Sequence, residues 1–63
     1  MYSILKCERK KRRITQNDMA EKIGLKTGSA YSKKEKGNVP FTVLEALKVS
    51  EIIGENVEYL FQQ

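Results

Sequence analysis

The chain has 63 residues, of which 40% are hydrophobic and 32% charged, and it carries a net charge of +4 at pH 7. A chain of this length forms one small domain and leaves no room for a deep substrate cleft. With no histidine and one cysteine, Cys7, it offers neither a Cys/His zinc site nor an internal disulfide, so we expect no enzyme, metal, cofactor or small-molecule ligand. No apolar run is long enough to span a membrane, and a reducing cytoplasm is the expected compartment.

A capping signal separates the first two predicted helices. The first helix is expected over about residues 2–12. Thr15 has the side chain of an N-cap, because Asp18 three residues later supplies the partner of a short capping box. The second helix, residues 16–23, has apolar side chains at i, i+1 and i+4, which indicates one buried face made of Met19, Ala20 and Ile23.

Glycine and proline predict the boundaries in the middle of the chain. Gly24 stands where a helix ends, and a short turn leads to a third helix over about residues 29–36, which Gly37 ends. The residue before Pro40 avoids helical backbone, so an extended segment is expected there. The buried Ala20 of the second helix allows the third helix to cross close to it.

The last two predicted helices also begin at capping residues. Thr42 and Glu45 form a full capping box, and Phe41 is placed to pack onto the helix that follows, which runs to residue 53. Asn56 caps a last short turn. Because no stretch alternates with a period of two, the sequence predicts an all-α fold, a compact bundle of five short helices.

Charge is divided unevenly along the chain. Residues 1–37 carry eleven lysines and arginines against four acidic residues, whereas residues 38–63 carry one lysine against four glutamates. Such a division indicates that one face is meant for a polyanion. The alternative is an ordinary solvated helix end, because residues 9–13 supply most of the excess.

The second and third predicted helices, within about residues 16–36, have the shape of a helix-turn-helix. Three segments, TQNDMAEKIG at 15–24, SAYSKKEKG at 29–37 and GENVEYLF at 54–61, resemble the phage-repressor or Cro-like (XRE-type) helix-turn-helix family. The resemblance covers residues 4–61. It implies a lambda-repressor-like fold over one domain, residues 1–63, that binds double-stranded DNA.

The resemblance also implies roles for individual residues. Gln16 is expected to contact a phosphate and brace the recognition helix, and Thr27 to cap that helix with its amides facing a phosphate. Arg9 and Glu35 match a pair that forms an internal salt bridge. The positions that usually reach base edges are Gly28, Ser29, Ser32 and Lys33, and the position that usually reaches the backbone is Lys36.

Helical spacing supports this DNA-binding set. Ser29, Ser32, Lys33 and Lys36 lie at i, i+3, i+4 and i+7, which places them on one polar face. A lysine can donate a hydrogen bond to guanine O6 or N7, and a serine can accept or donate at either base type. Tyr31 lies on the other side of the helix and is expected to pack inward.

Three departures from the family pattern stand out, and the first is Arg13, which occupies a position where a Gly or Asn often ends the first helix. The other two leave alternatives open. The segment from Gly24 to Gly37 is one residue longer than usual, so the base-reading register is fixed only to within one residue. Lys34 stands where the family usually has a buried aliphatic residue. Either the third helix is rotated, or the lysine extends its ammonium group to the surface.

We interpret the chain as a sequence-specific transcription regulator, a repressor that acts as a homodimer on a palindromic operator. The fourth helix is more apolar than one core stripe requires, so Leu44, Val49 or Ile52, with Tyr59 or Phe61, are expected to meet a second subunit. A wide internal contact is the alternative to this dimer. The alternative function is a small protein-interaction module, antitoxin-like or anti-repressor, with the same fold.

Overall fold

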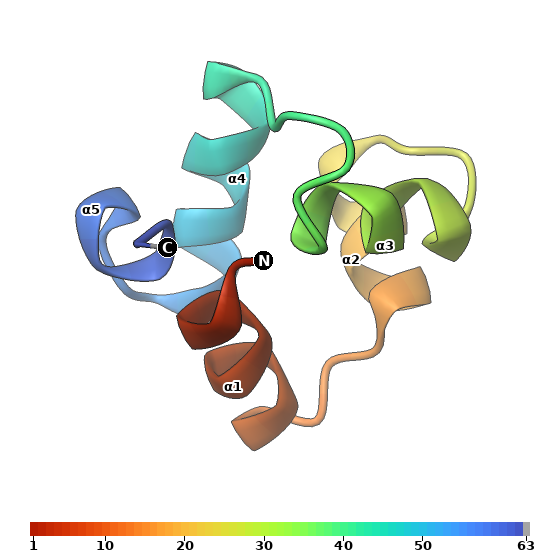
Figure 1. The fold of residues 1–63 in the computed structure, drawn as a ribbon. Helices are drawn as coiled ribbons and strands as arrows, with labels where there is room; N and C mark the ends of the chain where they lie inside the picture. The colour runs from red at the N-terminus through yellow and green to blue at the C-terminus, as the bar shows by residue number, and fades with distance from the viewer. Residues whose placement is uncertain (63) are drawn as a thin grey trace.

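The computed structural model describes residues 1–62 as five α-helices joined by short turns (Figure 1). They are α1 (Ser3–Lys11), α2 (Gln16–Ile23), α3 (Gly28–Glu35), α4 (Val43–Ile53) and α5 (Val57–Leu60). The predicted all-α bundle is confirmed, with the third helix one residue earlier than expected. None of these helices combines the length and the apolar character that a membrane-spanning segment needs.

Side-chain caps begin four of the five helices, as the sequence predicts. Each cap accepts a hydrogen bond from a backbone N–H three residues further on, which satisfies one of the donors that the first helical turn leaves without a partner. In α2 and α4 the third helical residue returns the bond and completes a capping box. The capping residues are Thr15, Thr27, Thr42 and Asn56.

Left-handed residues follow the ends of α1, α2, α3 and α4. After α2, α3 and α4 these residues are Gly24 (φ 88°), Gly37 (φ 89°) and Gly54 (φ 84°), as predicted. After α1 the left-handed position is occupied by Arg13, at φ 57°. A residue with a side chain is disfavoured there by roughly 1–2 kcal/mol. The chain therefore retains backbone strain at Arg13.

The core takes one to three side chains from every helix. Ala20 is 2% exposed, and its small side chain lets α3 pack closely on α2. At one end of the core four aromatic rings meet edge to face, with neighbouring centroids 5.0–6.0 Å apart: Tyr2, Tyr31, Phe41 and Phe61. The ring of Phe41 thus packs on three rings that lie outside the helix that it precedes. The buried hydrophobic residues are Leu5, Met19, Ala20, Ile23, Tyr31, Val49, Ile53 and Leu60.

The apolar side chains of α4 are divided between the core and the surface. Val49 is fully buried, so the expectation that it meets a second subunit is wrong. Its position in α4 faces the other helices of the bundle, and the half-buried Ile52 packs against the same core. Three large side chains on the first half of α4, which we name the α4 patch, are 55–79% exposed: Val43, Leu44 and Leu47.

Candidate nucleic-acid interface

An open groove lies between α1, the N-terminal end of α2 and one face of α3. Its volume is about 960 Å³. Five of the seven residues predicted to bind DNA line it: Gln16, Gly28, Ser29, Ser32 and Lys36. Lysines and arginines from α1 and the loop that follows face them, and no carboxylate is among the lining residues. Hydroxyl and amide groups donate hydrogen bonds, and the lysines and arginines attract negative charge that no carboxylate in the groove offsets. A surface with these groups is suited to bind a polyanion.

The other two predicted residues lie outside the groove. The Thr27 hydroxyl accepts a hydrogen bond from the amide of Ala30 at 3.1 Å, so the predicted cap of α3 is in place. Lys33 is exposed on α3, and its backbone carbonyl accepts the amides of Asn38 and Val39 after the helix ends. The predicted set is thus spread over the groove and the adjoining surface of α3.

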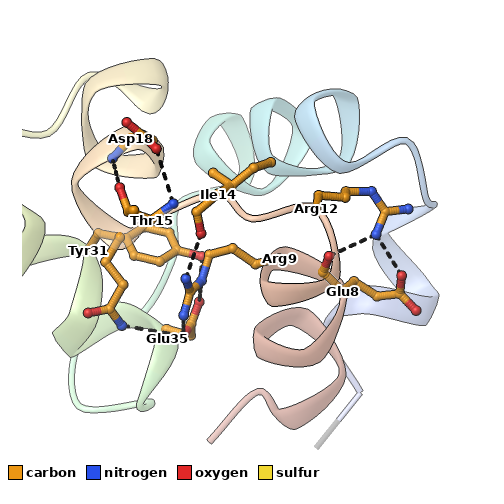
Figure 2. A network of polar contacts seen from close by, with 9 residues as sticks. Glu8, Arg9, Arg12, Ile14, Thr15, Asp18, Tyr31 and Glu35 are labelled. Carbon is orange, nitrogen blue, oxygen red and sulfur yellow. Dashed lines mark hydrogen bonds and ion pairs between the residues drawn. The ribbon is translucent and has the colours of Figure 1, made fainter.

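A buried ion pair joins the two sides of the groove (Figure 2). The guanidinium of Arg9 donates through Nε to Glu35 Oε2 at 2.9 Å and through Nη2 to Oε1 at 3.1 Å. Its Nη1 donates to the carbonyl of Ile14 at 2.8 Å. The predicted internal salt bridge is confirmed, with Arg9 5% and Glu35 2% exposed. Two parallel bonds of this kind fix the orientation of α1 relative to α3.

The charge on Arg9 is maintained by its partner. Burial by itself lowers the pKa of Arg9, but the hydrogen bond and the negative charge of Glu35 outweigh this effect and raise the pKa above its ordinary value. The guanidinium therefore stays protonated beneath the groove. Together with Glu35 it supports the groove from inside the protein.

Glu35 accepts two more hydrogen bonds. The hydroxyl of Tyr31 donates to Oε2 at 2.8 Å, and the side-chain amide of Gln16 donates to Oε1 at 3.4 Å. Tyr31 is fully buried, as expected. Burial raises the pKa of its hydroxyl most, and the hydrogen bond and negative charge of Glu35 raise it further, so the hydroxyl remains protonated and can donate. Gln16 reaches from the first turn of α2 to the last turn of α3, which is the bracing contact that the resemblance implied.

Gly28 has a packing role that the sequence did not indicate. A Cβ at this position would lie 1.9 Å from Oδ1 of Asn17 and 3.2 Å from the backbone nitrogen of Asn17. Any side chain at Gly28 therefore forces Asn17 to move. The glycine lets the first turn of α3 lie directly against α2, where the helix begins at the edge of the groove.

Sequence reasoning missed the contribution of α1 to the groove. The predicted DNA-binding set contains no residue of α1, and a solvated helix end is the alternative that the sequence leaves open for residues 9–13, yet Lys10 and Arg13 line the groove together with Lys6. Part of the signal was present in the spacing, because Lys6 and Lys10 at i and i+4 share one face of α1, whereas Arg13 lies beyond the end of the helix. Residues on opposite faces of α1 thus have different surroundings.

Arg12 belongs to a separate network between α1 and α5. Its Nη1 lies 2.7 Å from Glu8 Oε1, and the hydroxyl of Tyr59 donates to Glu8 Oε2 at 2.8 Å. The hydrogen bonds from Arg12 and then Tyr59 lower the pKa of Glu8. Glu55 adds a weaker contact to Arg12 at 3.9 Å. This network holds α5 against α1 on the far side from Arg9.

A helix-turn-helix family model matches residues 5–60, nearly the whole chain. The chain belongs to the XRE-type helix-turn-helix family. Comparison with curated proteins and with solved structures gave no match. The XRE-type family is one of DNA-binding transcription regulators and not of enzymes.

In this XRE-type chain Lys34 forms an ion pair with Glu45. The two alternatives considered from the sequence were a rotated third helix and a lysine whose ammonium group extends to the surface, and neither included this ion pair. Lys34 Nζ lies 2.6 Å from Glu45 Oε1 and donates to the carbonyl of Pro40 at 3.2 Å. The two charged side chains are only 12% and 15% exposed. Because Tyr31 is buried as predicted, α3 is not rotated. Lys34 stays at the junction of α3 and α4, where an ion pair takes the place of an aliphatic contact.

Proposed function

We propose that this chain is a sequence-specific double-stranded DNA-binding transcription regulator, a repressor that binds a palindromic operator as a homodimer. Family membership supplies DNA binding and transcription regulation. The observation that carries the proposal is the groove beside α3, which combines lysines and arginines with hydroxyl groups and contains no carboxylate. Occupation of a promoter by the protein then accounts for repression.

In the proposed complex α3 lies in the major groove, which is about 12 Å wide and admits one helix. Ser29, Ser32 and Lys33 face the base edges, where lysine donates to guanine O6 or N7. Gly28 allows the backbone of α3 to approach the DNA closely. These contacts give the protein its sequence preference.

Phosphate contacts place α3 in register. The first amides of α3 have no acceptor within the helix, and Thr27 caps only that of Ala30, so the amides of Gly28 and Ser29 point toward a phosphate. Gln16 and Lys36 contact the backbone on either side. Contacts of this kind supply affinity that depends on salt, because each releases a condensed counterion.

A homodimer accounts for the α4 patch. Contiguous exposed apolar side chains mark protein contacts in small soluble domains. One molecule measures 25 × 22 × 19 Å, which is shorter than the separation of about 34 Å between half-sites one helical turn apart. One protomer therefore covers one half-site, and two protomers joined through Leu44 and its neighbours cover a palindrome.

Fluorescence anisotropy with a mixed-sequence duplex, titrated across salt concentrations, tests DNA binding by this chain. The logarithm of the association constant should fall linearly with the logarithm of salt, corresponding to roughly 4–8 phosphate contacts per dimer. Absence of binding at low salt by the folded protein would contradict the proposal. A protein-interaction module would then be the better reading.

Selection of an operator from random duplexes tests sequence recognition. S32A and K33A should each lose about 1–3 kcal/mol of preference for the selected sequence over a mixed duplex. K26A, at an exposed lysine in the turn before α3, serves as the control and should keep the preference. An unchanged preference in both α3 variants would place base reading elsewhere.

A further inference from the structure

The residues so far given a role in DNA binding leave the α1 side of the groove unused. Three cations from α1 and the residue that follows its C-cap line this side: Lys6, Lys10 and Arg13. We name them the α1 wall. Lys6 and Lys10 lie about one helical turn apart, roughly 6 Å along the helix axis, and Arg13 follows beyond the end of the helix. Three cations placed one after another in this way suit a row of anionic groups better than a single small anion.

The α1 wall holds charge that the protein does not neutralise. On the other face of α1, Lys11 and Arg12 lie 3.6 Å and 2.7 Å from the carboxylate of Glu8. The α1 wall takes part in no ion pair within residues 1–62, and no carboxylate lines the groove. The uncompensated charge of α1 is therefore concentrated where an anionic ligand would enter.

Arg13 supplies an independent observation. It has the left-handed backbone that glycine adopts without strain, at φ 57°. A glycine would relieve the strain but would remove a cation from the groove. Residues with such backbone cluster at ligand-binding sites, and the side chain of Arg13 lines the groove.

The two sides of the groove are held at a fixed separation. Arg9 belongs to the same helix as Lys6 and Lys10, and its bidentate bond to Glu35 ties that helix to the end of α3. Lys36 follows Glu35 directly and lines the opposite side. A ligand in the groove thus meets cations on both sides without any rearrangement of the helices.

We propose that the α1 wall is a second phosphate clamp, which grips the backbone of the same duplex that α3 reads. The clamp rests on the proposed function and extends it. The ligand is a run of consecutive phosphodiesters. Because phosphate contacts carry no base information, the clamp sets the position of α3 and the affinity for any duplex, and not the sequence preference.

The test compares two neutralised pairs of lysines that change the net charge equally. K6Q/K10Q removes two charges from the α1 wall, and K11Q/K48Q removes two exposed charges that do not line the groove. In anisotropy titrations K6Q/K10Q should lower the salt slope by about two for each bound protomer and weaken binding tenfold or more at about 0.1 M salt. The loss should be equal for operator and mixed duplexes. K11Q/K48Q should bind nearly as the wild type does.

Two further variants separate charge from folding. K6R/K10R keeps the charges and should restore the slope and affinity of the wild type. R13N removes the charge but suits left-handed backbone, so it should fold at least as well as the wild type and lose about one unit of slope per protomer.

The possible outcomes distinguish the clamp from the proposed function. Equal losses for K6Q/K10Q and K11Q/K48Q, or a loss confined to the operator, would overturn the clamp while leaving DNA binding intact. A wild-type protein that binds no duplex would overturn both.

Discussion

Arg13 combines an unfavourable backbone conformation with a position on the groove. Its φ of 57° is left-handed, and its side chain lines the cationic side of the groove. Glycine would stabilise the fold at this position and weaken the interaction with anions. The residue is therefore one at which stability and ligand binding favour different amino acids.

We expect R13G to be more stable than R13A by roughly 0.5–1 kcal/mol, because the alanine keeps a Cβ in the left-handed region whereas the glycine does not. The greater freedom of glycine in the unfolded chain offsets part of the gain. Urea denaturation followed by circular dichroism measures the difference. Both variants lack the arginine charge and should lose DNA affinity to the same extent. An R13A protein as stable as R13G would indicate that the backbone at this position carries no strain.

Residue roles could be predicted where their cause is local or belongs to the family. The capping pairs Thr15–Asp18 and Thr42–Glu45 lie within one helical turn, and the pairing of Arg9 with Glu35 followed from the resemblance. Gly28 was different. Its backbone is ordinary, and only the packing of α3 on Asn17 explains it.

At the scale of the elements, α3 and α4 meet through one carboxylate with two functions. Glu45 Oε1 accepts the amide of Thr42 at 3.0 Å, which completes the capping box, and also the ammonium of Lys34 at 2.6 Å. Burial by itself raises the pKa of Glu45, but the bonds from Lys34 and then Thr42 outweigh it and hold the pKa below its ordinary value of 4.5. The N-terminal cap of α4 and the contact between α4 and α3 thus both depend on the negative charge of the Glu45 carboxylate.

This junction predicts a dependence of stability on pH. Because the folded pKa of Glu45 lies below the unfolded value, the ionised carboxylate stabilises the fold above about pH 4.5, and that stabilisation is lost as the pH falls through the folded pKa. Thermal unfolding of wild type and E45Q between pH 6 and pH 3 measures it. E45Q should be less stable than wild type at pH 6, and the gap should narrow toward pH 3. A gap that stays constant with pH would contradict the assignment.

The helices themselves were predictable, but the contacts between them were not. Periodicity and capping determine where a helix starts and ends, and both are local signals. Lys34 contacts Glu45 across the turn between α3 and α4, and Tyr59 reaches Glu8 over 51 residues of sequence. The groove likewise arises from two stretches of sequence, residues 6–17 and 28–36, and only their packing brings the cations of α1 opposite α3.

At the scale of the whole molecule, the basic part of the sequence builds the groove, and the acidic part, residues 38–62, lies outside it. The groove is built entirely from residues of α1, α2, α3 and their connections, whereas α4 and α5 contribute nothing to it. In Figure 1 α5 lies on the side of α1 away from α2 and α3. An acidic portion opposite a basic groove orients the protein as it approaches a polyanion.

The α4 patch predicts the oligomeric state. L44N/L47N changes no charge and alters two exposed side chains, so the fold should remain intact while the dimer dissociates. Sedimentation equilibrium at high micromolar concentration should give a dimer for wild type and a monomer for the variant. V39N, a change at an exposed apolar residue outside the patch, should remain dimeric. A monomeric wild type, or a variant that dimerises equally well, would contradict the proposed interface.

The buried pair of Arg9 and Glu35 has a consequence for how operators can diverge. The hydrogen bonds of this pair involve only Arg9, Glu35, Tyr31, Gln16 and the carbonyl of Ile14. None of these bonds involves Ser29 or Ser32 of α3. Substitution of an exposed residue that makes no such bond usually changes stability by less than about 0.5 kcal/mol. After gene duplication, a copy could therefore acquire a new target sequence through a few changes on α3 while inheriting an unaltered scaffold.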